Sequence, residues 1–110
     1  MNNNNTIYQV GFYVPKIHLE QVKEKLFAAG AGRLGNYERV AWQTKGIGQF
    51  CPKKGSDPYL GKTGKLKTVA EYKVEMICAE KHIKQVIAAL KESHPYEEPA
   101  YSVIRCETPD

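Results

Sequence analysis

The chain has 110 residues, of which 42% are hydrophobic and 25% charged, and its formal net charge is +4. A chain of this length forms one domain and buries roughly two-thirds of the surface that its unfolded form exposes. The charge is well below that of a dedicated nucleic-acid binder, and no apolar run is long enough to span a bilayer. Nucleic-acid and membrane functions are therefore not expected.

The N-terminal segment consists of a methionine and four asparagines, with neither the basic start nor the apolar centre of a signal peptide. We expect residues 1–6 to form a disordered tail and residues 7–110 to form the single domain. The cysteines, Cys51, Cys78 and Cys106, are too widely spaced for a metal knuckle, and their odd number argues against a disulfide framework. A cytoplasmic location is the natural expectation.

The first half of the chain predicts a strand, a helix and a second strand. Residues 7–14 alternate with period two, and Pro15 ends this strand because it has no N–H to donate. Apolar residues then recur at helical spacing up to Ala29, and the glycines that follow end the helix. Residues 37–45 are expected to form the second strand.

The second half predicts a long loop, a strand, a helix and a last strand. Residues 46–66 are rich in glycine and contain two prolines, so we expect a long loop or an extended hairpin arm. Residues 68–78 alternate again, with an apolar face that includes Val74 and Met76. An amphipathic helix follows and ends at the break around Pro95, and residues 100–106 form the closing strand.

This order of elements, βαββαβ, is that of an α+β ferredoxin-like sandwich. Right-handed crossovers place both helices on one face of a four-stranded antiparallel sheet. The other face would carry Gln9 and Tyr13 from the first strand, and Lys73 and Glu75 from the third. Such a mixed face is either solvated or packed against another subunit.

Two glycine-containing stretches resemble nucleotide-binding motifs without the required context. Residues 30–35 match GxGxxG, but they follow a helix, so a pyrophosphate would meet the wrong end of the helix dipole. Gly61, Lys62 and Thr63 resemble the end of a phosphate loop, but Ser56 stands where its first glycine is required. We interpret the first stretch as a helix cap and turn, and the second as a flexible basic loop.

Positive charge nevertheless gathers in this loop, at Lys53, Lys54, Lys62, Lys65 and Lys67. Loops on rigid scaffolds are frequent binding sites. The hypothesis that this loop binds a small anionic ligand, such as a nucleotide or another phosphorylated molecule, is therefore retained.

Residues 94–101 combine an imidazole, two carboxylates, two phenols and two prolines where a helix gives way to a strand. In a structural interpretation, His94 is a cation beside the helix C-terminus, and Tyr96 and Tyr101 supply core contacts through rings that carry a polar tip. In a functional interpretation, His94, Glu97 and Glu98 bind a metal or form an acid–base pair. Adjacent glutamates in an extended segment point in opposite directions, which favours the structural interpretation.

Four motifs together carry a resemblance to a known family: GAGRLGNY at 30–37, GQFCP at 48–52, PYLGKTGKL at 58–66 and HPYEEPAY at 94–101. From residue 7 to residue 106 the chain resembles the inserted domain of the NIF-three-like proteins, the NGG-one-interacting-factor relatives of the bacterial YqfO type. That domain is similar in fold to the CutA and PII signalling proteins. The resemblance therefore implies a PII/CutA-like domain and favours a homo-oligomer, with a trimer as the expected state.

Full-length members of this family carry a dinuclear metal site built by the two halves that flank the insert. This chain has no such halves, so we expect it to act as the insert alone, without enzymatic activity or a cofactor. The expected function is a small PII/CutA-like regulatory or ligand-sensing module. Its candidate ligand-binding residues are Lys53, Lys54, Lys62, Lys65, His94, Tyr96, Glu97 and Glu98.

Two alternatives remain open. The first is a protein–protein interaction module that partners a metal-binding NIF-three-like protein. The second is a divalent-metal-binding protein that acts through His94, Glu97 and Glu98.

Overall fold

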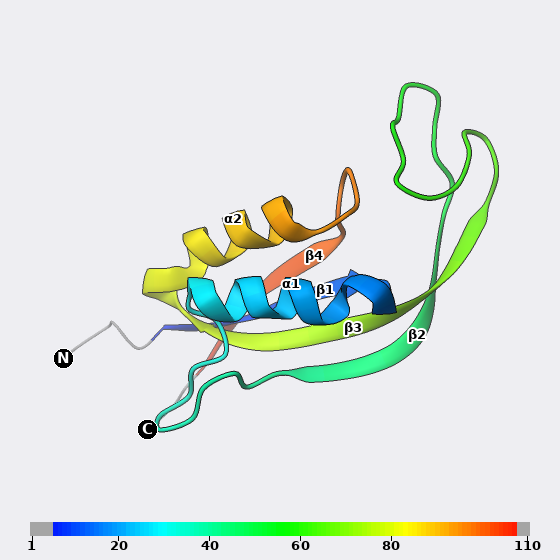
Figure 1. Cartoon of the computed structure of the whole chain (residues 1–110). Coiled ribbons are helices and arrows are strands. Elements are labelled where there is room, and N and C mark those ends of the chain that lie inside the picture. Colours follow the sequence, from blue (N-terminus) through cyan, green and yellow to red (C-terminus); the bar gives the residue numbers. More distant parts are fainter. Residues whose placement is uncertain (1–5, 108–110) are drawn as a thin grey trace.

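The computed structural model describes residues 6–107; the tail expected at residues 1–6 lies, apart from Thr6, outside them. The elements in chain order are β1 (Ile7–Val14), α1 (Lys16–Ala29), β2 (Trp42–Phe50), β3 (Lys67–Ala79), the one-turn 3-10 helix η1 (Glu80–His82), α2 (Ile83–Ser93) and β4 (Tyr101–Cys106) (Figure 1). Neither of the two α-helices within this part of the chain is long and apolar enough to cross a membrane.

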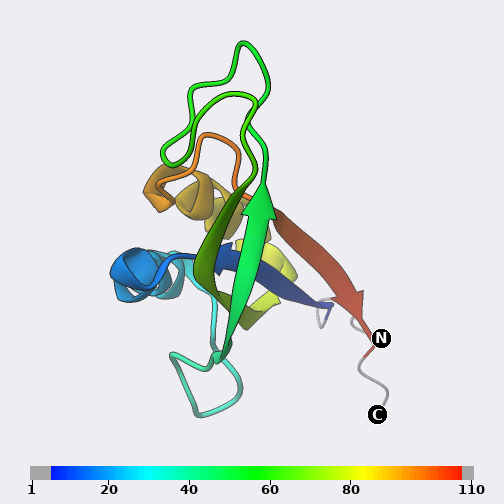
Figure 2. The same ribbon diagram turned by 90° about the vertical axis from the view of Figure 1, so that its right-hand side faces the viewer.

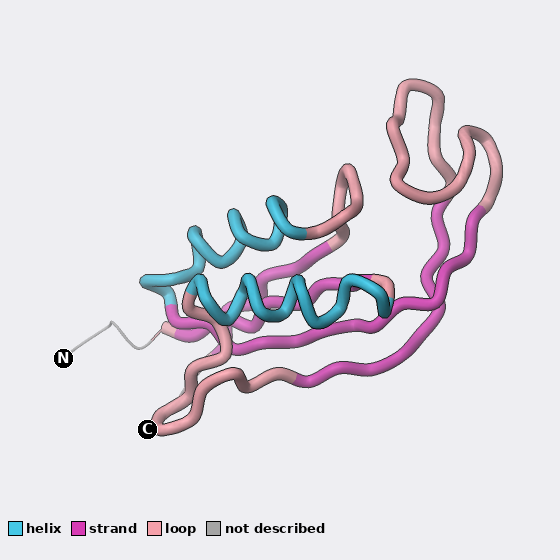
Figure 3. The backbone as a smooth tube through the Cα atoms, viewed as in Figure 1, coloured by secondary structure: helices cyan, strands magenta, loops and turns pink. Residues whose placement is uncertain are grey.

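The four strands form one antiparallel sheet in the order β2-β3-β1-β4. Both α-helices lie on the same face of this sheet (Figures 1 and 3). β1 is one of the two inner strands and pairs on both sides: Val10 stands opposite Met76 of β3 and Val103 of β4. At the start of the same strand, Ile7 stands opposite Cys106. The predicted α+β ferredoxin-like arrangement is confirmed.

The hydrophobic core lies between the helices and the sheet face that they cover. The alternation in β1 and β3 points every second side chain to this face, where burial of each large apolar side chain contributes about 1.5–3 kcal/mol. The side chains without measurable exposure are Val10, Phe12, Val14, Val22, Leu26, Val74, Val86 and Leu90. The core thus joins β1, β3, α1 and α2 into one unit.

The opposite sheet face carries the polar residues that the alternation assigns to it. The Nε2 of Gln9 donates a hydrogen bond to Oε2 of Glu75 at 2.8 Å. Nζ of Lys73 lies 3.9 Å from the same carboxylate oxygen. Tyr13 ends this row on β1 and is 40% exposed. The face is mixed in character, as predicted.

The glycines after α1 end the helix and do not open another. Gly30 is the C-terminal cap, with φ of 122°, and its N–H donates to the Phe27 carbonyl at 3.1 Å. Only glycine adopts such a backbone conformation without strain. The GxGxxG stretch therefore has the cap-and-turn role that the sequence predicts.

The prediction for the second strand is wrong in its position. The sequence predicts this strand at 37–45 and a long loop or an extended hairpin arm at 46–66, whereas β2 spans Trp42–Phe50. Glycine usually weakens a strand, so the sequence alone favours a place outside the strand for Gly46 and Gly48. In the structure they pair with Glu71 and Val69 of β3. The connecting loop therefore shortens to residues 51–66.

Residues 46–50 of β2 and 67–71 of β3 form a two-stranded arm. These parts of the two strands pair with each other, whereas β1 pairs with β3 from Tyr72 onward. The arm projects beyond the helices and carries the loop 51–66 at its tip (Figures 1 and 3). A two-stranded ribbon twists more strongly than a sheet, and the arm in Figure 2 turns accordingly. The molecule is elongated, with a longest dimension of 53 Å.

Candidate ligand-binding site

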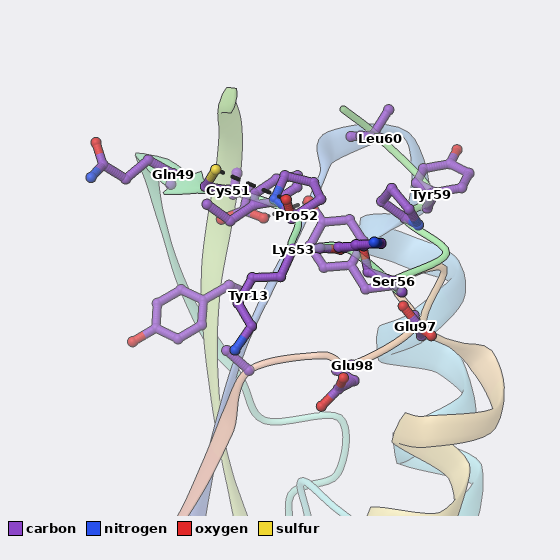
Figure 4. A pocket seen from close by; sticks show the side chains of 18 residues that line it. Tyr13, Gln49, Cys51, Pro52, Lys53, Ser56, Tyr59, Leu60, Glu97 and Glu98 are labelled. Atoms are coloured by element: carbon purple, nitrogen blue, oxygen red, sulfur yellow. Dashed lines mark hydrogen bonds between the residues drawn. The ribbon is translucent and has the colours of Figure 1, made fainter. Parts of the chain in front are cut away.

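A cavity of about 690 Å³ lies where the arm, the loop 51–66 and the turn 94–100 meet (Figure 4). Pockets for small organic ligands have volumes of roughly 300–1,000 Å³. Four aromatic rings, three carboxylates and two lysines contribute to its lining: Tyr13, Phe50, Tyr59, Tyr96, Glu71, Glu97, Glu98, Lys53 and Lys54.

The wall on the arm is built around Glu71. Phe50, Gly48 and Glu71 share one face of the arm, because residues that alternate along paired strands point the same way. Glu71 is only 8% exposed. A Cβ atom at Gly48 would collide with Oε1 of Glu71. The glycine in β2 thus provides the space in which this carboxylate folds over the neighbouring strand.

The wall on the turn is built around Tyr96. Its hydroxyl donates to Oε2 of Glu71 at 2.6 Å. Its ring centroid lies 6.2 Å from that of Phe50 and 6.3 Å from that of Tyr59. Burial, together with this hydrogen bond, raises the pKa of Tyr96 well above its usual value. Tyr96 is therefore a neutral donor that joins the turn to the arm.

His94 fastens the turn to the sheet behind Tyr96. The imidazole is 6% exposed, its Nε2 donates to the Tyr13 carbonyl at 2.6 Å, and its Nδ1 accepts the Tyr96 backbone N–H at 3.1 Å. A backbone N–H can only donate, so Nδ1 carries no proton. Burial also lowers the pKa of His94. The expectation of a cationic imidazole at the helix C-terminus is therefore wrong: His94 is neutral.

The loop 51–66 is held against the body of the protein by two polar contacts. The backbone N–H of Asp57 donates to Oε1 of Glu97 at 3.0 Å, which joins the loop to the turn. The hydroxyl of Tyr59 lies 2.8 Å from Nε2 of His18, which joins the loop to α1. The first contact joins residues 40 positions apart in the chain, and the second joins residues 41 positions apart.

The structure does not bring His94, Glu97 and Glu98 together as a ligand set. Both ring nitrogens of His94 are engaged by the backbone, and Glu97 accepts from the loop. Within residues 6–107, no group of three or more histidine, cysteine, aspartate and glutamate side chains is placed to hold a metal ion.

The predicted site residues divide into two groups. Lys53, Lys54, Tyr96, Glu97 and Glu98 line the cavity, and Figure 4 shows Lys53, Glu97 and Glu98 around the same space. The remaining three, Lys62, Lys65 and His94, do not line it.

Sequence reasoning missed the residues on the arm. Phe50 lies in the stretch that the sequence predicts as a long loop or a hairpin arm, and Glu71 lies on the strand face that is predicted to be either solvated or packed against another subunit. The available signal was Gly48, since a glycine within a strand often marks a close approach of another group.

The chain is similar in sequence and in structure to part of several known proteins. No protein-family model matches the chain. A curated relative from Halalkalibacterium halodurans, "GTP cyclohydrolase 1 type 2 homolog", is 45% identical over 98 residues, which are 89% of this chain and 26% of the relative. A solved Bacillus cereus protein related to NIF3 has a TM-score of 0.84 at 34% identity, covering 97% of this chain and 27% of that one. The resemblance to NIF-three-like proteins is confirmed. The chain spans about a quarter of the length of these relatives.

More distant solved structures share the fold alone. The periplasmic divalent cation tolerance protein CutA from Archaeoglobus fulgidus has a TM-score of 0.67 at 14% identity, covering 94% of this chain and 86% of CutA. The complex of Bacillus subtilis GlnK with ATP has a TM-score of 0.63 at 12% identity, covering 96% and 85%. The PII/CutA-like fold of this small module is confirmed.

Proposed function

We propose that this chain is a non-catalytic regulatory or ligand-sensing module, and that a small organic molecule binds in the cavity between the arm, the loop 51–66 and the turn 94–100. The observation that carries the proposal is the convergence of these three segments on the cavity, with the loop held in place by the contacts of Asp57 with Glu97 and of Tyr59 with His18. A bound molecule touches all three segments at once, so it shifts the equilibrium between closed and open arrangements of the loop.

The state of the two best acid–base candidates supports a non-catalytic role. His94 uses both ring nitrogens in hydrogen bonds to the backbone. The pKa of Tyr96 is raised, so its hydroxyl keeps its proton near neutral pH. General acid–base catalysis works best with groups that titrate near the working pH. The proposed function requires no cofactor.

We also propose that residues 7–110 act as one domain in the cytoplasm and associate into a homo-oligomer, with a trimer as the expected state. Exposed apolar side chains on both outer strands support association: Trp42 and Ile47 on β2 are 68% and 82% exposed, and Ile104 on β4 is 55% exposed. Native mass spectrometry gives the mass of the assembly directly, and a monomer at micromolar concentration would contradict this part of the proposal.

The same spectrum tests ligand binding. Gently purified protein is expected to carry a small-molecule mass that Tyr59→Ala loses, because Tyr59 lines the cavity. The matched control is Tyr37→Ala, since Tyr37 is 74% exposed and lies outside the cavity. A retained mass that survives Tyr59→Ala would contradict the proposed site. If no mass is retained, a fragment screen that leaves all cavity amides unshifted in NMR spectra would contradict ligand binding itself.

A second candidate function is an interaction module for a metal-binding NIF-three-like protein. The observation that favours it is the exposure of large apolar side chains away from the cavity, including Ile17 at 82% and Tyr37 at 74%. Co-elution with such a protein in size-exclusion chromatography, lost in Ile17→Ser or Tyr37→Ser, is the expected result. Separate elution of the two proteins would contradict it.

A further inference from the structure

We propose that the ligand of this cavity is an organic cation: a protonated amine, amidine or guanidine that carries N–H donors and is joined to a flat apolar group. The inference rests on the proposed function, in which the cavity binds a small molecule, and adds the charge and shape of that molecule. It replaces the small anionic ligand expected from the lysines of the loop.

The position of Glu71 favours a cationic ligand. Its carboxylate lines the cavity, is almost wholly buried, and accepts one hydrogen bond, from the Tyr96 hydroxyl to Oε2. The ion pairs among residues 6–107 do not include Glu71. A carboxylate offers about four acceptor positions, and burying it without a cation is costly. A ligand with a charged N–H group at Oε1 offsets this cost.

The aromatic rings that line the same cavity also favour a cation. The rings of Phe50 and Tyr59 both lie within 6.3 Å of the Tyr96 ring, centroid to centroid. Aromatic faces attract cations that lie within about 6 Å, and they stack on flat apolar groups. A cavity lined by a buried carboxylate and by these aromatic rings therefore fits an organic cation better than an inorganic ion.

The charge balance of the lining favours a cation as well. Two lysines, Lys53 and Lys54, face three carboxylates, Glu71, Glu97 and Glu98. Both lysines are exposed, and their flexible stems let the ammonium groups turn to solvent. Glu71 has no such freedom because Tyr96 holds it. An anion in this cavity would therefore meet a fixed negative charge, whereas a cation would not meet a fixed positive one.

Three probes of the same shape test the charge of the ligand on the unaltered chain. Benzamidine, benzamide and benzoate share one ring and carry charges of +1, 0 and −1. Backbone amide shifts of Gly48, Glu71 and Tyr96 in two-dimensional NMR spectra follow their binding. We expect benzamidine to bind at least ~10-fold more tightly than benzamide, because an amidinium forms a bidentate, charge-assisted pair with a carboxylate. Benzoate is expected to bind most weakly.

The variant Glu71→Gln tests the residue that makes the distinction. Glutamine keeps an oxygen that can accept from Tyr96 but loses the charge, so benzamidine affinity is expected to fall about tenfold while benzamide affinity stays unchanged. Glu92→Gln is the matched control, because this exposed residue of α2 is outside the cavity and its change in charge is the same. If Glu71→Gln does not fold, the series of three probes still decides the question.

The outcomes separate the two proposals. Benzoate binding as tightly as benzamidine, or benzamidine affinity unchanged by Glu71→Gln, would overturn the cationic ligand and leave a ligand-binding cavity in place. An anionic molecule retained by the purified protein and lost in Tyr59→Ala would do the same. Absence of any amide shift with all three probes overturns the cationic ligand as well, and the retained-ligand experiment then decides the proposed function by itself.

Discussion

The covered half of the sheet and the projecting arm share one strand, β3, yet they are stabilised differently. From Tyr72 to Ala79 this strand lies beside β1 and buries Val74, Met76 and Cys78 under the helices. From Lys67 to Glu71 it pairs with β2, and Glu71 is the buried residue of the arm. The covered half is held by apolar burial, whereas the arm is held by a few polar and aromatic contacts. Segments of the second kind open at lower free energy, which is what a responsive binding site requires.

The largest expected effect on stability comes from comparing the loss of one phenylalanine in each half. Phe12→Ala removes a ring with no exposed surface from the core and is expected to cost about 3–5 kcal/mol of unfolding free energy. Phe50→Ala, in the half-buried arm, is expected to cost less than half as much. Urea denaturation followed by circular dichroism measures both changes. Equal losses for the two variants would show that the arm is as tightly packed as the core.

Two glycines of the arm give a matched pair. Gly48→Ala places a Cβ against Oε1 of Glu71, so the carboxylate must move and its bond from Tyr96 is lost, at a cost of about 1–3 kcal/mol. Gly46→Ala meets no atom within 4 Å and is expected to change stability by less than ~0.5 kcal/mol. Denaturation midpoints of both variants provide the test. A destabilised Gly46→Ala with an unaffected Gly48→Ala would contradict the packing described for Glu71.

The neutral state of His94 predicts a pH dependence of stability. Its pKa in the folded protein is lowered from the usual 6.5 by burial, so below that pH the unfolded chain binds more protons than the folded one. The stabilisation from the neutral imidazole is therefore complete above pH 6.5 and is lost as the pH falls toward the lowered value. Denaturation at pH 7.5 and 5.5 measures the loss. In His94→Gln this dependence is expected to flatten, and an unchanged slope would assign it to other groups.

A small effect on global stability is expected at the exposed contact between the loop and α1. His18→Ala removes the partner of the Tyr59 hydroxyl and is expected to change global stability by less than about 1 kcal/mol. Hydrogen exchange of the amides in the loop 51–66 is expected to accelerate, while exchange in β1 stays unchanged. If exchange accelerates equally in β1, the loop and the core open together and the contrast between the two halves fails.

The covered half of the fold could be predicted from the sequence because its signals are local. Period two in residues 7–14 and 68–78 and the helical spacing between them follow from which side chains face the core. The boundaries of β2 could not be predicted. Gly46 and Gly48 weaken a strand by intrinsic preference, and their place in β2 depends on pairing with β3.

The candidate site was predictable only in part, for a related reason. The composition of residues 94–101 marked the turn, and Tyr96, Glu97 and Glu98 do line the cavity. Glu71 is buried because the twisted arm brings it against Gly48 and Tyr96. These contacts are between residues far apart in the chain, so the pattern of residues along one strand does not predict them. The neutral state of His94 likewise depends on the Tyr13 carbonyl, which lies 81 positions away in the chain.

The pairing of Ile7 with Cys106 has a consequence for how this unit can be carried. Opposed residues of an antiparallel pair have Cα atoms roughly 4.5–5.5 Å apart, so the chain enters and leaves the sheet at almost one point. Such a unit can be spliced into a surface loop of a host protein without separating the two ends of that loop. The arm projects at the end of the sheet away from this point (Figure 1), and the cavity lies against the arm. In a host of that kind, the cavity would stand clear of the attachment and face outward into the surrounding medium.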